Sequence, residues 1–322
     1  MAQVSSHLVS TEESERLLAE VEGAAPHAAE GIFGPDSMSW KVNREAALFL
    51  AAGRAALLQL AHPWVAAAIA EHSRTLRDPV GRFHQTFRVM FTIVFGSTGQ
   101  CLAAARQLHR RHQSIRGRMP ETVGPVAEGS LYEANDLAAL TWVYATLVDS
   151  ALLAYELVLP PLTLDEREQC YSEGRTTAAL FGIPKESLPR NWTEFQTYFD
   201  SMLQSDIVLV SPTARAIAHH LHAGTGSRLR PPFWYRSLTT HLLPLSMRQE
   251  FQFAYGAREQ RAATRALRWL PRIYRVLPPA VRFVGPYREA QARLAGKVRP
   301  SLAVRLSNRL WVGQPTLLNS GD

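Results

Sequence analysis

A group of polar side chains with helical spacing lies in a largely apolar part of the chain. Arg82, Gln85 and Thr86 stand at positions i, i+3 and i+4, so in a helix they share one face. Apolar residues surround this group on both sides in the sequence. The arrangement suits the polar wall of a flat, apolar cofactor pocket.

A second group with the same spacing follows one helix later. His109, His112 and Arg116 share one face of a helix that the sequence predicts from Gln100 to Gly117. A haem iron needs only one protein ligand, and a neutral imidazole supplies it. His112 suits this role, Arg116 suits a haem propionate, and His109 is the competing ligand on that face. The alternative interpretation of His112 is an ordinary core or surface histidine.

The other histidines and the cysteines do not fit a metal site made by protein alone. The eleven histidines lack the HExxH spacing, and the two cysteines lie far apart without a CxxC pair. His219, His220 and His222 are close in sequence, but adjacent helical residues face different sides, so we expect them on a solvated surface. The sequence has no glycine-rich phosphate loop, Ser-His-Asp order or paired-carboxylate motif that would indicate a different kind of active site.

Composition and the N-terminus indicate an intracellular, soluble protein. Of 322 residues, 46% are apolar and 20% charged, which is ordinary for a globular chain. Residues 1–7 lack a basic segment followed by an apolar one, so we expect no signal peptide. The most apolar run, 46–70, contains Arg54, His62 and Pro63, which favours a buried helix over a membrane span. The expected location is cytoplasmic, with peripheral membrane contact as an option.

Positive charge is concentrated towards the C-terminus. From Ser227 onwards there are 17 Lys and Arg against four Asp and Glu, a difference of +13. Six arginines recur there at spacings of 3, 4, 3, 4 and 3, namely Arg258, Arg261, Arg265, Arg268, Arg272 and Arg275. If the helix continues past Pro271, they form a basic amphipathic face able to lie on an anionic membrane. A solvated helix face is the alternative, and no nucleic acid is expected because no binding motif is present.

The elements that position these residues all have helical patterns. Helices are expected over 40–61, from the Asp78-Pro79 pair to Phe95, and from Asp136 to about residue 159, with breaks at Pro63 and Gly96. No strand pattern or internal repeat is present, so the predicted fold class is all-α. We divide the chain into an N-terminal arm (1–34), a helical core (35–223) and a basic C-terminal helical extension packed on the core (224–322).

Several ordered motifs resemble one known family. They are the Gly53–Pro63 run GRAALLQLAHP, Glu71-His72-Ser73, Asp78-Pro79 with Arg82-x-x-x-Thr86, His112-x-x-x-Arg116-Gly117, and WVYATLVDS over 142–150. Together they resemble the family that includes the rubber oxygenases (latex-clearing proteins) and the MpaB-type oxygenases. The resemblance covers roughly residues 40–203.

The resemblance implies both a fold and a cofactor. Characterised members are haem b proteins with a globin-like helical core, and they cleave an olefinic double bond with O2. It implies His112 as the proximal iron ligand, Arg82 and Thr86 on the distal side, and Arg116 near the haem.

Two positions depart from the family pattern, and one role is open. Gln85 stands where the rubber oxygenases have lysine, and a glutamine is a poor iron ligand. Tyr144 stands where many relatives have histidine, so a haem contact there would be phenolic; core packing is the alternative. Either Glu71 or His72 is the expected pocket acid or base.

The sequence therefore predicts a haem b-dependent, oxygenase-like oxidoreductase that uses O2 on a hydrophobic, olefinic organic substrate. Two other functions are open. One is a non-catalytic haem sensor or carrier, and the other is a helical protein that binds membrane surfaces.

Overall fold

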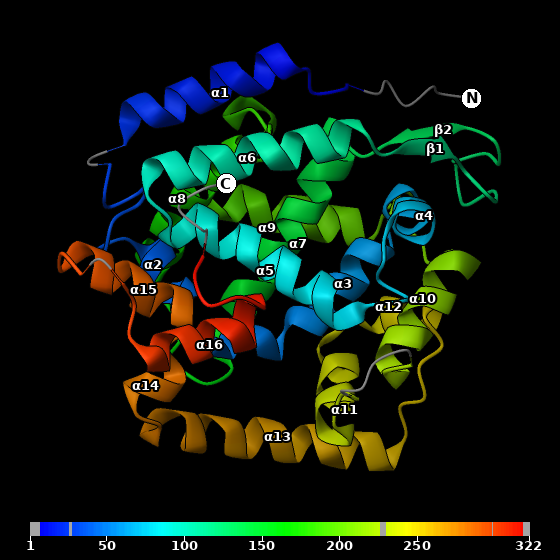
Figure 1. The fold of residues 1–322 in the computed structure, drawn as a ribbon. Helices are drawn as coiled ribbons and strands as arrows, with labels where there is room; N and C mark the ends of the chain where they lie inside the picture. The colour runs from blue at the N-terminus through cyan, green and yellow to red at the C-terminus, as the bar shows by residue number, and fades with distance from the viewer. Residues whose placement is uncertain (1–6, 26–27, 226–229, 298, 318–322) are drawn as a thin grey trace.

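The fold is described by a computed structural model for residues 7–25, 28–225, 230–297 and 299–317. These residues are mostly helical, since 66% of them lie in helices and the sheet among them consists of two short antiparallel strands (Figure 1). The helical prediction is confirmed, while the small hairpin corrects the expectation that no strand exists. Residues 1–6, which entered the signal-peptide prediction, lie outside the described part.

Sixteen α-helices, two 3-10 helices and two strands occur in the described part. The first elements are α1 (Thr11–Ala24), α2 (Met38–Asn43), η1 (Ala46–Leu50), α3 (Ala52–Leu60), α4 (Pro63–His72), α5 (Pro79–Phe95), α6 (Thr98–Gln113), β1 (Arg116–Arg118), β2 (Leu131–Glu133) and α7 (Leu137–Glu156). The later elements are α8 (Leu164–Leu180), η2 (Lys185–Ser187), α9 (Trp192–Leu203), α10 (Pro212–Ala223), α11 (Phe233–Leu242), α12 (Leu245–Glu250), α13 (Ala257–Val276), α14 (Pro279–Arg282), α15 (Gly285–Leu294) and α16 (Leu302–Val312).

Local capping signals fix the two helices that hold the candidate site. The Asp78 carboxylate accepts a backbone N–H at 2.9 Å, and Pro79 occupies the first position of α5. Helix α5 ends at Gly96, and Ser97 starts α6 through a capping box with Gln100. In Figure 1 the two helices diverge from this turn, so the start of α5 and the end of α6 lie well apart.

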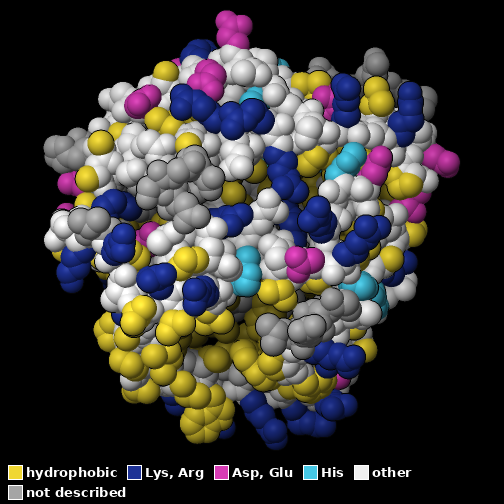
Figure 2. All heavy atoms as spheres, in the orientation of Figure 1, with side chains coloured by type: hydrophobic (Ala, Val, Ile, Leu, Met, Phe, Trp, Pro, Cys, Tyr) yellow, Lys and Arg dark blue, Asp and Glu magenta, His cyan; other side chains and the backbone are white. Residues whose placement is uncertain are grey.

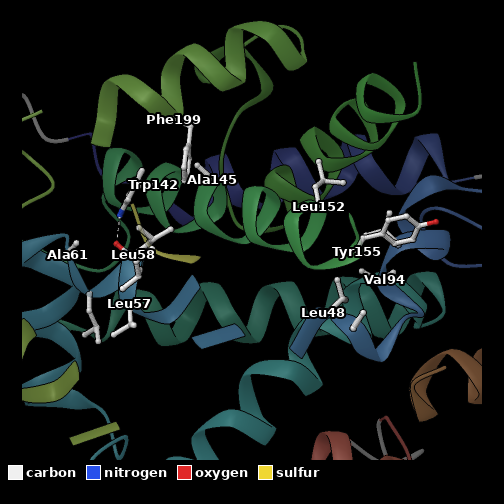
Figure 3. Packing of buried hydrophobic residues seen from close by; sticks show 14 of the residues in the cluster. Leu48, Leu57, Leu58, Ala61, Val94, Trp142, Ala145, Leu152, Tyr155 and Phe199 are labelled. Carbon is white, nitrogen blue, oxygen red and sulfur yellow. Dashed lines mark hydrogen bonds between the residues drawn. The ribbon is translucent and has the colours of Figure 1, made fainter. Parts of the chain in front are cut away.

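Helix α7 lies at the centre of the core. The Trp142 indole is fully buried, donates to the Leu58 carbonyl of α3 at 3.0 Å and stacks on Phe199 of α9 (Figure 3). By length and composition α7 could cross a membrane, but 56% of its apolar window is buried inside the protein. Its contacts with η1, α3 and α8 identify it as the central core helix.

Outer helices cover this core on different sides. Helix α1 packs on α6 and α8 through an apolar cluster that includes Leu18 and Leu102. Helices α15 and α16 pack on α5, and α13 packs on α11 along the opposite edge of the molecule from α1 (Figure 1). The C-terminal part of the chain therefore reaches α5 directly.

The helix predicted over 40–61 is wrong, because the chain there forms α2, η1 and α3. The break is at Glu45, whose backbone bridges to Phe283, while the Arg44 carbonyl accepts from the Val284 amide at 2.9 Å. The Glu45 carboxylate, 1% exposed, also accepts from the Arg282 guanidinium at 2.8 Å. These contacts with the distant α14 region hold the backbone out of a continuous helix.

The helix predicted to end at Gly117 also needs correction. Helix α6 stops at Gln113, and the Ser114 hydroxyl donates to the Arg111 carbonyl at 2.7 Å. The chain then extends into β1, where Gly117 pairs with Tyr132 of β2. A Cβ on Gly117 would lie 2.5 Å from the Tyr132 hydroxyl oxygen, so this close approach requires glycine.

His62 gives the fold a dependence on pH. Its side chain is 5% exposed, its Nδ1 has no partner among the described residues, and burial lowers its pKa from 6.5 to about 4. Between these two pH values the unfolded chain binds a proton that the folded chain excludes, so stability falls as pH is lowered. We expect this histidine to contribute a loss of about 3 kcal/mol in the free energy of unfolding from pH 7 to pH 4.

Urea unfolding of the wild type and of His62→Leu at several pH values in this range measures that contribution. The variant should show the shallower dependence on pH. The matched control is His7→Gln, because His7 is exposed and pairs only with Glu13 at 3.2 Å. Parallel pH dependences in the wild type and His62→Leu would contradict the assignment.

Candidate functional site

The polar face of α5 is ordered by a bond between two of the predicted residues. The Arg82 Nη1 donates to the Thr86 hydroxyl at 3.0 Å, and that hydroxyl donates to the Arg82 carbonyl at 2.9 Å. Within the described part of the chain, the Arg82 side chain has no carboxylate partner and the Gln85 side-chain amide makes no hydrogen bond. Arg82 therefore offers unused N–H donors and an uncompensated charge.

His112 of α6 lies close enough to Arg82 for its pKa to respond to that charge. Burial, with smaller contributions from Arg82, His109 and Arg111, lowers the pKa of His112 to about 4. Its ring makes no hydrogen bond to the residues that the structure describes. A neutral imidazole with a free nitrogen therefore lies within electrostatic range of the Arg82 guanidinium.

The surroundings of these two side chains form a hollow rather than a filled core. His112 and Arg82 are each only half-buried in surface area, yet burial is the main cause that lowers the pKa of each. Figure 2 shows the surface hollowed between α6 and α5, with Lys and Arg side chains at the edges and hydrophobic side chains deeper in.

The competing ligand His109 lies on a different side of α6. Its ring is 8% exposed, and its Nδ1 lies 4.0 Å from where a Cβ on Gly182 would stand. Burial lowers the pKa of His109, while Glu15 of α1 raises it. The structure thus places His109 near α1 and the Gly182 turn, whereas the charge that acts on His112 comes from Arg82 and Arg111.

Arg116 is not one helical turn beyond His112, because α6 has already ended. Its side chain is exposed on β1, and its carbonyl accepts from the His72 ring at 3.1 Å. Arg111 is the cation next to the site instead, since its charge lowers the pKa of both Arg82 and His112. Its position just before His112 is the sequence signal that we overlooked.

Glu71 and His72 lie together at the end of α4, against the β hairpin. The Tyr132 hydroxyl donates to the Glu71 carboxylate in a short hydrogen bond, and the His72 Nε2 stands 3.7 Å from the same carboxylate. Burial and Glu71 raise the pKa of Tyr132, so the phenol remains a donor at neutral pH. Strand β1, which this cluster contacts, begins at Arg116, four residues after His112. Among the described residues no hydrogen bond or ion pair joins the cluster to Arg82.

Tyr144 lies away from His112, against α8. Its ring packs in a cluster with Val9, Ala178 and Ile183, and its hydroxyl lies 2.6 Å from where a Cβ on Gly174 would stand. The hydroxyl has no hydrogen-bond partner among the described residues, and burial raises its pKa well above 10. A buried, protonated phenol among apolar side chains fits core packing.

A row of phenylalanines forms the opposite face of α5, which the sequence analysis did not single out. They are spaced by four residues, so they align along the helix: Phe83, Phe87, Phe91 and Phe95. Phe49 of η1 contacts this row, with ring centroids 4.5 Å from Phe87, and stacks on Trp311 of α16 at 4.1 Å. Helix α5 therefore separates the polar hollow from an aromatic wall covered by α16.

Among the described residues, no group of three His, Cys, Asp or Glu side chains could hold a metal ion. His219 is exposed as expected, but His220 and His222 are half-buried. The ring of His220 bonds to the Leu76 carbonyl at 3.0 Å, and that of His222 to the Thr240 hydroxyl at 3.1 Å. These histidines connect α10 to neighbouring segments.

Comparison with known proteins gives one match. Residues 40–273 match the family described as ER-bound oxygenase mpaB/B'/Rubber oxygenase, catalytic domain. No curated protein and no solved structure matches the chain. The matched range begins at α2, includes both helices of the hollow and reaches Ile273 in α13. Because it covers well over half of the chain, this protein belongs to the MpaB/rubber oxygenase family and contains its oxygenase catalytic domain.

Proposed function

We propose that this protein is a haem b-dependent oxidoreductase that uses O2 on a hydrophobic organic substrate, with His112 as the iron ligand. The observation that supports it most directly is the free imidazole nitrogen of His112, which lies within electrostatic range of the Arg82 guanidinium, a cation without a carboxylate partner among the described residues. In an oxygenase catalytic domain, this pair combines a metal ligand with an anion-binding group. By analogy with globins, α6 would carry the ligand and α5 would face it.

The residues present fit a haem group. A neutral imidazole is the form that coordinates iron, and His112 is neutral at pH 7 because of its low pKa. Carboxylates such as haem propionates pair well with guanidinium groups, and Arg111 lies within electrostatic range of His112 without an ion-pair partner in the described residues. When bound, haem supplies the redox-active iron that O2 chemistry requires.

The polar face of α5 orients the reacting groups. Thr86 fixes the Arg82 guanidinium through one N–H, which leaves the other N–H groups free to hold a polar substrate atom or an anion. Gln85 adds a neutral amide that does not compete for iron, unlike the lysine of the rubber oxygenases. The aromatic wall on the far side of α5 excludes water from that flank.

We assign proton transfer to the Glu71 cluster. The Glu71 side chain is 55% exposed, so its carboxylate can exchange protons with solvent. Tyr132 donates to it and remains protonated, while His72 is held by the Arg116 carbonyl. Of the two predicted residues, Glu71 is therefore our candidate for the acid or base, with His72 beside it.

Oxygen uptake tests the proposal. We expect haem-loaded protein to consume O2 steadily when an unsaturated lipid is added, and Arg82→Ala to lower that rate roughly 100-fold because a fixed charge near the reacting atoms is lost. A Clark electrode measures both, with Arg16→Ala on the exposed face of α1 as the charge-matched control. Equal rates in the two variants would remove Arg82 from the mechanism.

A non-catalytic haem sensor or carrier is the second candidate function. Gln85 supports it, because this position lacks the lysine of the rubber oxygenases and its amide bonds to no described residue. The oxygen-uptake experiment separates the two functions. Haem-loaded protein that consumes no O2 with any unsaturated lipid would favour the sensor or carrier.

A further inference from the structure

The C-terminal region presents a continuous basic helix face. Helix α13 continues through Pro271, so all six regularly spaced arginines lie on one helix. All six of its regularly spaced arginines are exposed, and none forms an ion pair with a described residue. We define them as the basic face: Arg258, Arg261, Arg265, Arg268, Arg272 and Arg275. The single acidic residue of α13, Glu259, caps the helix start through the Gly256 amide at 2.9 Å.

An apolar groove runs beside the basic face, between α11 and α13. Its volume is about 610 Å³. Aromatic and aliphatic side chains line it, including Trp234, Trp269 and Ile273, while Arg261 and Arg265 stand along its rim. The groove thus combines an apolar floor with a cationic edge, which matches the acyl chains and headgroup of an anionic lipid.

Large apolar side chains are exposed next to this groove. On α13, Trp269 is 53% exposed, Ile273 is 52% exposed and Val276 is 81% exposed. Helices α14 and α16 continue the apolar surface with Val281, Leu302, Leu306 and Leu310. Figure 2 shows hydrophobic side chains gathered over α14, α16 and the adjacent end of α13, with Lys and Arg side chains along the lower edge. Exposed apolar surface of this kind marks an interaction site.

We propose that the face formed by α11, α13, α14 and α16 binds the surface of a lipid bilayer that contains anionic headgroups. The basic face pairs with headgroup phosphates, and Trp269, Ile273 and the α16 leucines enter the boundary between headgroups and acyl chains. The charge difference of +13 in the chain from Ser227 onwards draws this side to the membrane. A lipophilic substrate that is dissolved in the bilayer would then meet the protein on this face.

A bilayer explains the surface better than a nucleic acid does. Phosphate contacts alone would account for the arginines, but not for exposed Leu, Ile and Val side chains interleaved with them. Tryptophan at the edge of an apolar patch is typical of membrane interfaces, and both Trp234 and Trp269 occupy such positions.

The membrane-binding face is preformed. Ala263, Ala266 and Tyr274 on the inner side of α13 are buried, and the Tyr274 hydroxyl donates to the Glu45 carboxylate at 2.8 Å. Tyr274 therefore anchors α13 to the body of the protein. The arginines and Trp269 keep their orientation before a membrane arrives, so binding requires no folding of the helix.

Vesicle flotation with the full chain tests this proposal without any cofactor, so it can fail independently of the haem assignment. The probes are vesicles of phosphatidylcholine alone and of phosphatidylcholine mixed with phosphatidylglycerol. We expect binding only to the mixed vesicles, weakened by salt. Replacing Arg261, Arg265 and Arg268 with Gln should lower the affinity roughly 100-fold, because each exposed charge near an anionic surface contributes about 1 kcal/mol.

Two further variants separate membrane docking from a general charge effect. Replacing Arg16, Arg74 and Arg77 with Gln removes the same charge from exposed positions outside the face and should leave binding unchanged. The double variant Trp269→Ser, Ile273→Ser keeps every charge, and should lower binding about tenfold because the apolar contact is lost. Circular dichroism verifies that each variant retains its helix content.

The results decide in both directions. Loss of binding in the Arg261/Arg265/Arg268 variant and in the serine variant, with retention in the Arg16/Arg74/Arg77 control, supports the proposal. No binding to the mixed vesicles, equal losses in both arginine variants, or binding to duplex DNA without binding to mixed vesicles would overturn it.

Discussion

Replacing His112 with alanine is expected to lower the affinity for haem strongly. The proposed site has one protein ligand to iron, and His112 supplies a neutral ring whose nitrogen bonds to no described residue. Loss of an outer partner of a metal ligand commonly weakens metal affinity 10- to 100-fold, so loss of the ligand itself should lower haem affinity by roughly 100-fold or more. Haemin titration followed at the Soret band measures the affinity.

His109→Ala is the matched control for this experiment. It removes the same residue type from the same helix, but from the side that faces Gly182 and α1. We expect the control to lose some stability because His109 is buried, and to keep its affinity for haemin. Full haemin affinity in His112→Ala together with loss in His109→Ala would transfer the ligand role to His109.

Replacing Glu45 with alanine is expected to destabilise the fold by about 3–5 kcal/mol. Its carboxylate is buried and accepts hydrogen bonds from Tyr274 and Arg282, both at 2.8 Å. Removing one partner of a buried charge pair leaves the other without compensation. The same change leaves Tyr274 of α13 and Arg282 of α14 without their carboxylate partner. Urea unfolding followed by circular dichroism measures the free energy.

A surface pair provides the comparison for Glu45. Glu15 bonds to Arg106 at 2.9 Å, but both side chains are about half exposed, at 46% and 40%. Glu15→Ala should therefore cost less than about 1 kcal/mol. Similar losses in the two variants would mean that the Glu45 network contributes little beyond an ordinary surface ion pair.

Features encoded by neighbouring residues could be predicted from the sequence. Asp78 and Pro79 start α5, Gly96 ends it, and Pro63 restarts the chain as α4, because capping and proline sterics act within one helical turn. The shared face of Arg82 and Thr86 follows from the same local geometry, and the structure joins these two side chains by hydrogen bonds.

Features that depend on distant partners could not be predicted. Glu45 breaks a helix because Arg282, 237 residues later, binds its carboxylate. Helical spacing predicts which face of α7 carries Tyr144. It does not predict that α8 covers this face, with Gly174 close to the Tyr144 hydroxyl. Arg116 leaves the α6 face because β1 pairs with β2, a contact that three-residue strands do not signal in sequence.

We propose that this protein holds a haem whose distal side is open to small ligands. An absorption spectrum of the purified protein, as isolated, after dithionite and after CO, tests it most directly. We expect a Soret band that shifts on reduction and shifts again with CO. A colourless protein that also fails to bind added haemin would contradict the claim, and only the helical fold and its membrane-binding face would remain to be tested.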